Sequence, residues 1–316
     1  MKKTKVIIPA LAVLLLSTAA SVTGTVAWFA MNSTVAATGM QIKVNSQNTY
    51  LLISGTNTTA SAIQSENSTS AALTVTAEQA LVQPSHPVSN AEQAALLNTT
   101  NGKDVSGATI TTAGAIVEDA ATAAEFTNWY TAVAAATDAP TMLEGSARQL
   151  TAFTGYVVVR HAYLTVAVGS NPVGNLKITS SITPKGLSAS SDTQASASKS
   201  YYSYTTGVYT NLNLAENAEV PEGSFEYASA SGPAKVDMRA IKLMVATNDG
   251  AFDILDYADN DVETDIKGSN NSITSSIVRI VDLYLYVDGE NAAVYTNNAL
   301  NLADADVSLS FSAVQA

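Results

Sequence analysis

The chain has 316 residues, of which 47% are hydrophobic and 13% are charged; it has no cysteine, and its formal net charge is −12. This length suffices for one large β domain or two modest ones, and the absence of cysteine excludes disulfides and a lipid anchor on a thiol. An acidic chain with no basic run argues against nucleic acids and anionic membrane surfaces as partners.

The first residues have the pattern of an export signal. Three lysines precede the apolar run 6–16, which has the length of a signal-peptide core and is too short for a permanent membrane anchor. Small residues favour cleavage after Ala20 or after Ala27, and the second cut leaves Trp28 at the new N-terminus. We therefore expect residues 1–27 to be a signal peptide, with membrane contact only before cleavage. The mature chain is expected to be secreted to the extracellular matrix or cell surface.

Alternating apolar and polar residues predict β-strands through most of the chain. Met40, Ile42 and Val44 mark the first strand, and residues 276–287 have the strongest pattern. Further strands are expected at 49–54, 156–168, 176–183, 201–209, 239–247, 251–255 and 306–314. Turn signals between these segments, without a βαβ rhythm, predict an all-β fold, a jelly-roll β-sandwich.

Residues 55–150 differ in composition and are expected to be a partly helical insertion in the sandwich. They are rich in Ala, Ser, Thr and Asn, and a helix is predicted over 117–136. Trp129 and Tyr130 form a heavy aromatic pair that we expect to dock this segment on the main body. The domain prediction is therefore a single β-sandwich over 40–316 that contains the insertion.

Three groups of residues resemble the TasA/camelysin family, which comprises secreted surface and biofilm-fibre proteins of Gram-positive bacteria. The groups are residues 25–29, which are similar to the family's cleavage site, residues 38–44, which are similar to its first strand, and residues 308–315, which are similar to its last strand. The resemblance covers both ends of the chain and the strand pattern between them, and residues 55–150 have no counterpart. It implies a jelly-roll subunit that forms fibres by donor-strand exchange, in which the N-terminal arm of one subunit completes the sheet of the next.

The arm, residues 28–39, suits that role physically. About ten extended residues reach roughly 33 Å, enough to lie along a neighbour's sheet. Burial of Trp28, Phe29, Met31 and Val35 in a neighbour's groove is worth on the order of 8 kcal/mol before ordering costs. Because a head-to-tail contact does not close on itself, it grows a homopolymer. The alternative is an arm that pairs within its own subunit or forms a free tail.

The sequence thus predicts a structural protein, not an enzyme, in a fibre, pilus-like filament or biofilm matrix. Other matrix or cell-surface components are expected as further partners. An alternative is a secreted glycan-binding or adhesin module, because four tyrosines on an exposed strand, predicted at 201–209, could stack on sugar rings. These tyrosines are Tyr201, Tyr202, Tyr204 and Tyr209.

A second alternative is a camelysin-like metalloprotease, because the resemblance implies a link to metal-dependent proteolysis. The two histidines, His86 and His161, lie far apart in the sequence and outside any HExxH motif. We expect His86 in an exposed loop and His161 as a cross-strand surface residue. A zinc site would therefore need carboxylate ligands from elsewhere in the fold.

An acidic loop is the candidate cation site. Seven carboxylates lie within residues 249–265, and Asp253, Asp256, Asp259 and Asp261 are the candidate calcium ligands. Hard oxygen ligands on a flexible loop suit Ca²⁺, although the spacing is not that of an EF-hand. The alternative is a solvated acidic loop. No cofactor other than calcium is expected.

Overall fold

The computed structural model describes residues 40–45, 51–73, 83–87, 129–131, 149–247, 252–267, 272–289, 291, 293–294 and 305–315. These residues form strands with one α-helix, so the predicted all-β sandwich is confirmed. No helix in these ranges is long and apolar enough to cross a membrane.

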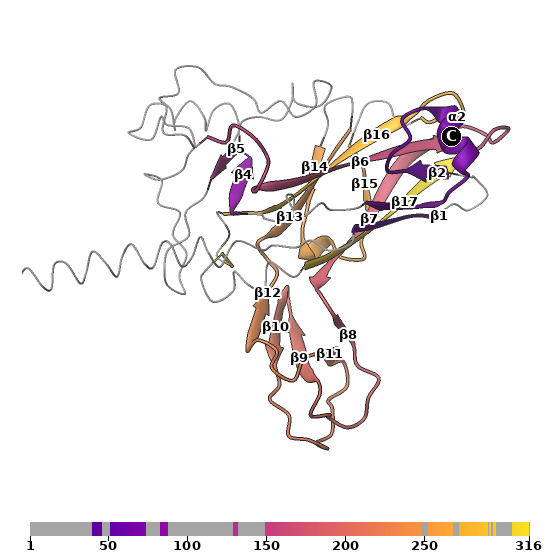
Figure 1. Cartoon of the computed structure of the whole chain (residues 1–316). Helices are drawn as coiled ribbons and strands as arrows, with labels where there is room; N and C mark the ends of the chain where they lie inside the picture. The colour runs from indigo at the N-terminus through magenta and orange to yellow at the C-terminus, as the bar shows by residue number, and fades with distance from the viewer. Residues whose placement is uncertain are drawn as a thin grey trace, which may run out of the picture.

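Two five-stranded sheets pack face to face as the sandwich (Figure 1). Sheet I contains, in spatial order, β15 (Glu263–Asp265), β7 (Val173–Pro184), β17 (Ala305–Gln315), β1 (Met40–Asn45) and β3 (Ser70–Leu73). Sheet II contains β14 (Phe252–Leu255), β13 (Ile241–Thr247), β16 (Arg279–Val287), β6 (Val157–Val166) and β2 (Leu51–Ser54). Alternate residues of both sheets, such as Ile178 and Phe311 of sheet I and Leu164 and Leu283 of sheet II, fill the core between them.

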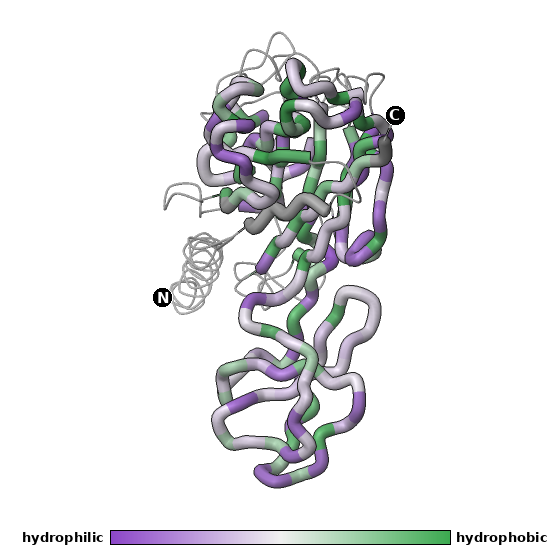
Figure 2. Tube along the Cα trace, turned by 90° about the vertical axis from the view of Figure 1, so that its right-hand side faces the viewer, coloured by the Kyte–Doolittle hydropathy of each residue, from purple (hydrophilic) through white to green (hydrophobic). Residues whose placement is uncertain are grey.

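A third sheet projects from the sandwich as a lobe over residues 187–237, inserted between β7 and β13 (Figure 1). Its strands are, in spatial order, β12 (Lys235–Asp237), β10 (Val208–Asn211), β9 (Ser200–Thr205), β11 (Phe225–Tyr227) and β8 (Leu187–Ala189). Seen from the side, the lobe extends away from the sandwich and carries fewer strongly hydrophobic residues (Figure 2). The strand predicted at 201–209 is therefore split into β9 and β10 by a turn at Gly207, whose φ is +82°.

A two-stranded pair, β4 (Ser85–Pro87) and β5 (Trp129–Thr131), belongs to the insertion. Trp129 is fully buried and packs with its ring centre 5.0 Å from Tyr286 and 5.5 Å from Phe153. The expected docking of this aromatic segment on the main body is thus confirmed. The helix predicted over 117–136 is wrong at Trp129–Thr131, because pairing with β4 and burial of Trp129 outweigh the local helix preference of alanine.

Helix α2 (Ala60–Glu66) also belongs to the insertion and follows β2. Asn67 ends the helix in the left-handed conformation, and Ile63 is buried. The Gln64 side-chain amide donates to the carbonyls of Val166, at 2.8 Å, and Ser275, at 2.7 Å. These bonds tie the helix to sheet II.

The edge of sheet I beside the first strand

The strand that follows the predicted arm, β1, lies inside sheet I rather than outside it. It pairs in parallel with β17, with Ile42 opposite Leu309 and Val44 opposite Phe311, and antiparallel with β3. Leu309 and Phe311 are buried in the core. Parallel neighbours need a long connection, and here almost the whole chain separates the two strands. The first and last strands of the fold are therefore direct neighbours.

The two strands beside β17, β7 and β1, pair with segments of β17 that differ in length. β7 pairs with β17 from Ala305 to Gln315, whereas β1 pairs only with the segment from Ser308 to Ser312. Because β1 runs parallel to β17, the chain that precedes Met40 reaches sheet I at the end where β17 begins. No described strand pairs with Ala305–Val307 on that side. Within the described part of the chain, β1 thus begins beside a backbone edge of β17 that has no partner.

The residues predicted to act in processing and assembly lie outside the described residues. These are the cleavage position between Ala27 and Trp28 and the arm residues Trp28, Phe29, Met31 and Val35. The structure shows where the arm is attached and leaves the prediction for its side chains untested.

Carboxylates of the acidic loop form ion pairs with lysines and cap a 3₁₀ turn. Asp253 pairs with Lys267, and Asp256 Oδ2 lies 2.5 Å from Lys242 Nζ. Asp256 also caps the 3₁₀ turn η3 (Tyr257–Asp259), and the Asp259 carboxylate accepts from the Asp256 backbone N–H at 2.9 Å in return. Across the described ranges, no three His, Cys, Asp or Glu side chains gather into a group that could hold a metal ion. The structure therefore offers no argument for calcium at these residues.

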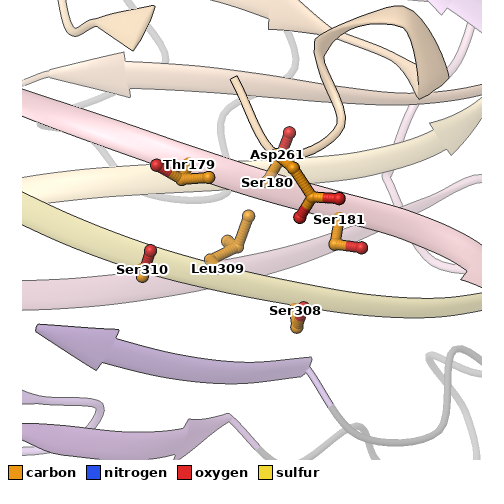
Figure 3. A pocket seen from close by; sticks show the side chains of 7 residues that line it. All are labelled: Thr179, Ser180, Ser181, Asp261, Ser308, Leu309 and Ser310. Carbon is orange, nitrogen blue, oxygen red and sulfur yellow. The ribbon is translucent and has the colours of Figure 1, made fainter. Parts of the chain in front are cut away.

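The fourth candidate, Asp261, is exposed at a shallow hollow of about 160 Å³ on the outer face of sheet I (Figure 3). Its backbone N–H donates to the Ser180 carbonyl at 2.8 Å. The hollow is lined by Thr179, Ser180, Ser181, Asp261, Ser308, Leu309 and Ser310. Small-molecule sites usually measure about 300–1,000 Å³, so this hydroxyl-rich hollow is too small to enclose such a ligand.

The histidines lie in two different environments. His86 is only 8% exposed in β4, so the prediction of an exposed loop is wrong; pairing of β4 with β5 buries it. His161 lies in β6 opposite Asp282, as expected for a cross-strand residue, and its Nδ1 is 2.5 Å from the Asp282 carboxylate.

The tyrosines of the lobe do not form an exposed row. Tyr201, Tyr202 and Tyr209 are buried, and only Tyr204, at 41%, is exposed. The Tyr202 hydroxyl donates to the Pro233 carbonyl at 2.8 Å, and burial raises the pKa values of Tyr202 and Tyr209 to about 12. The expectation of an exposed tyrosine strand is wrong because Tyr202 and Tyr209 join the main hydrophobic core and Tyr201 packs in a small cluster with Ala195 and Val220. The observation that motivated a glycan-binding module is thereby lost.

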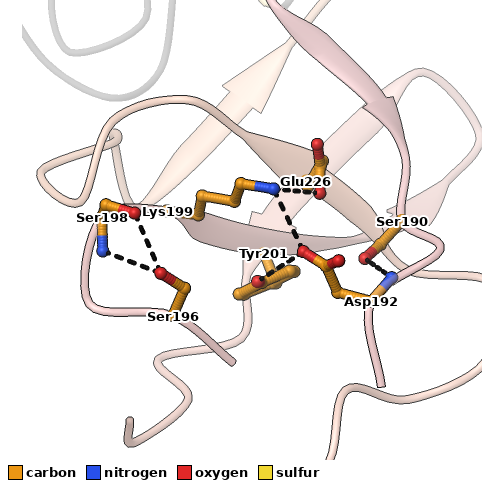
Figure 4. A network of polar contacts seen from close by, with 7 residues as sticks. All are labelled: Ser190, Asp192, Ser196, Ser198, Lys199, Tyr201 and Glu226. Atoms are coloured by element: carbon orange, nitrogen blue, oxygen red, sulfur yellow. Dashed lines mark hydrogen bonds and ion pairs between the residues drawn. The ribbon is translucent and has the colours of Figure 1, made fainter. Parts of the chain in front are cut away.

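Within the lobe, a polar network links the loop before β9 to β11 (Figure 4). Lys199 Nζ lies 2.9 Å from the Glu226 carboxylate and 3.0 Å from that of Asp192. The hydrogen bonds from the lysine to the two carboxylates raise the pKa of Lys199, and the bond with Lys199 lowers the pKa of Asp192. A lysine held in its charged form acts as a structural cation and not as a nucleophile.

Comparison with known proteins yields no match for this chain: no family model matches it, and neither a curated protein nor a solved structure does. Its function must therefore be inferred from its own residues and geometry.

Proposed function

We propose that the protein is a secreted structural subunit of an extracellular fibre, pilus-like filament or biofilm matrix. Subunits assemble head to tail when the arm, residues 28–39, adds to a sheet of the next copy. The observation that carries the proposal is the position of β1: Met40 lies beside the start of β17, where Ala305–Val307 have no partner on that side among the described strands. The resemblance of the chain's ends to TasA/camelysin proteins supports the same role.

The lengths of the arm and of this edge favour addition to another copy. Among the described residues, an arm that continued β1 along its own subunit would find only Ala305–Val307 of β17 beside it. The arm has twelve residues, so most of its backbone donors and acceptors would need water or another sheet. A neighbour's sheet edge supplies these partners, and a groove there could bury Trp28 and Phe29. No chemical reaction is needed for this assembly.

Two mature forms test the proposal, one that starts at Trp28 and one that starts at Gly39. Both retain β1, so both should fold. The longer form is expected to form filaments in negative-stain microscopy and to elute as large species in size-exclusion chromatography, whereas the shorter form stays monomeric. If both run as the same compact monomer, the proposal is wrong.

The shorter form also tests the direction of growth. It has a sheet to receive an arm but no arm to donate, so a small amount added to the longer form should shorten the filaments. Ser substitutions at Trp28 and Phe29 should prevent assembly, whereas Ser substitutions at the polar positions Asn32 and Thr34 are the matched control and should leave it intact. Equal effects of the two pairs would contradict a role for the apolar arm residues.

A further inference from the structure

The strand β14 forms one edge of sheet II, and its outward side chains are apolar and exposed. It pairs with β13 on one side, and no described strand pairs with its other side. Phe252 and Ile254 are 42% and 43% exposed and lie two positions apart, on the outer face of the sheet. Opposite them lie Ala246 and Met244, which pack in the cluster around Trp129. The apolar outer face of sheet II thus continues to this edge.

Other edge strands of the sandwich are protected against pairing with another chain. All four residues of β2, at the opposite edge of sheet II, are buried. At an edge of sheet I, β15 carries Glu263 and Asp265, which form ion pairs with Lys177. Burial and charge are common means by which natural proteins keep edge strands unpaired. The outward side chains of β14 have neither protection, which indicates an edge that pairs with another strand.

Ion pairs make the surroundings of β14 electrically neutral. Asp253 pairs with Lys267 and accepts from the backbone N–H of that lysine at 3.3 Å. Asp256, directly after the strand, pairs with Lys242. The whole chain has a formal net charge of −12, so two copies repel each other overall. At β14 they can approach with little repulsion between like charges.

The length and the pattern of β14 fit a second β14. The strand has four residues, whereas the arm has twelve, so this edge would leave most backbone groups of an arm unpaired. Directly opposite residues of an antiparallel pair face the same side of the sheet. A two-fold axis at Asp253 therefore sets Phe252 of each copy against Ile254 of the other. Each Asp253 carboxylate is neutralised by the lysine of its own copy.

We propose that the β14 edge binds a second copy of this chain. The two β14 strands pair antiparallel, with Phe252 opposite Ile254, and join two copies of sheet II into one continuous sheet. This contact is isologous and closes on itself, so it joins subunits in pairs and does not lengthen a fibre. The pairing does not depend on the proposed function.

The size of the contact sets its strength. Four residues on each side bury far less than the roughly 1,600 Å² of a standard interface. Single copies therefore associate weakly and run as monomers in chromatography. Where subunits are aligned in a fibre, many such contacts act together and bind two fibres side by side.

Introduced cysteines test the register, because the chain has none of its own. Phe252→Cys and Ile254→Cys are made separately in the form that starts at Gly39. Both positions are exposed, so both variants should fold. In the proposed register a cysteine at one position lies opposite the other position, about 4.5–5.5 Å away between Cα atoms. Two cysteines at the same position lie diagonally, about 7–8 Å apart, which is too far for a disulfide.

The expected result is a covalent dimer that forms only when the two variants are mixed. At high protein concentration and under a mild oxidant, the mixture should give a dimer on a non-reducing gel, and reduction should remove it. Each variant alone should stay monomeric. Val262→Cys mixed with Ile277→Cys, two exposed apolar positions outside β14, is the matched control and should give no dimer. A similar yield from either variant alone would contradict the register, and no dimer in any sample would contradict the pairing.

A synthetic peptide of residues 28–39 distinguishes a second copy from the arm. Added in excess, it should leave the yield of the mixed dimer unchanged. If the peptide suppresses the dimer, the β14 edge receives the arm and the proposal is wrong. Because the tested form has no arm, the outcome is separate from whether the longer form makes filaments.

Discussion

His161 Nδ1 lies 2.5 Å from Oδ1 of Asp282, and Asp282 is completely buried. The two residues face each other across the β6–β16 pair. The second carboxylate oxygen of Asp282 has no hydrogen-bond partner among the described residues. The histidine is thus the partner on which this buried acid depends.

Replacement of His161 by Leu should therefore destabilise the protein by about 3–5 kcal/mol, the usual cost of leaving a buried charge unpaired. Urea unfolding of the form that starts at Gly39 measures this change without interference from assembly. The double variant His161→Leu with Asp282→Leu should recover part of the loss, because both polar groups are then removed. A His161→Leu variant as stable as the parent would show that Asp282 does not need the histidine.

The form that starts at Gly39 should also report directly on the buried aromatic cluster. The chain has two tryptophans, Trp28 and Trp129, so only Trp129 remains in this form. Because Trp129 is fully buried beside Phe153 and Tyr286, its fluorescence emission should be blue-shifted and should not be quenched by iodide. Red-shifted emission that iodide quenches in the native state would contradict the docking of β5. Unfolding in urea provides the exposed reference.

Gly207 should be critical for attaching the lobe to the sandwich. A Cβ at this position would lie 2.7 Å from the ring of Tyr257 in η3, so Gly207→Ala combines a left-handed backbone with a steric overlap. Gly186 and Gly223 also have positive φ but have no atom within 4 Å of an added Cβ, which makes them matched controls. Thermal unfolding should show a larger loss for Gly207→Ala than for either control, each of which should cost about 1–2 kcal/mol. Equal losses in all three variants would contradict close packing of the lobe against η3.

The buried tyrosines predict a loss of stability in alkali. Tyr202 and Tyr209 have pKa values raised to about 12 by burial, and burial also raises the pKa of Tyr286. In the unfolded chain these phenols lose their protons near pH 10. Stability should therefore be unaffected by these groups below about pH 10 and should fall as the pH rises from about 10 to about 12.

Tyrosinate absorbance as a function of pH measures this effect, since the late-ionising tyrosines should titrate together with unfolding. Tyr202→Phe should remove one late-ionising group. A single transition near pH 10 for all thirteen tyrosines in a chain that is still folded would contradict the burial.

The sequence predicted those strands that have one buried face and one exposed face. In β17 the alternation of Val307, Leu309 and Phe311 with serines predicted both the strand and its buried face, because successive side chains point to opposite sides. The same alternation located β16, although Tyr284 and Tyr286 on its outer face are buried as well. The alternation in a strand shows which of its faces is apolar. It does not show whether another segment covers the opposite, partly polar face, as happens on the outer face of β16.

The candidate sites depended more on distant residues. The acidic loop suggested calcium from sequence, yet Lys242, Lys267 and the cap of η3 engage three of the four candidate carboxylates, those of Asp253, Asp256 and Asp259. Ion pairs and sheet edges join residues far apart in the chain, so their partners follow from the fold alone.

The sequence by itself determined the all-β class and the approximate strand positions, because these depend on neighbouring residues and on the two-residue period of a strand. Only the tertiary structure decided that β1 lies parallel to β17, that a third sheet buries the lobe tyrosines and that β4 buries His86. Each of these depends on pairing between strands distant in sequence, where backbone hydrogen bonds and burial, and not local preference, select the partner.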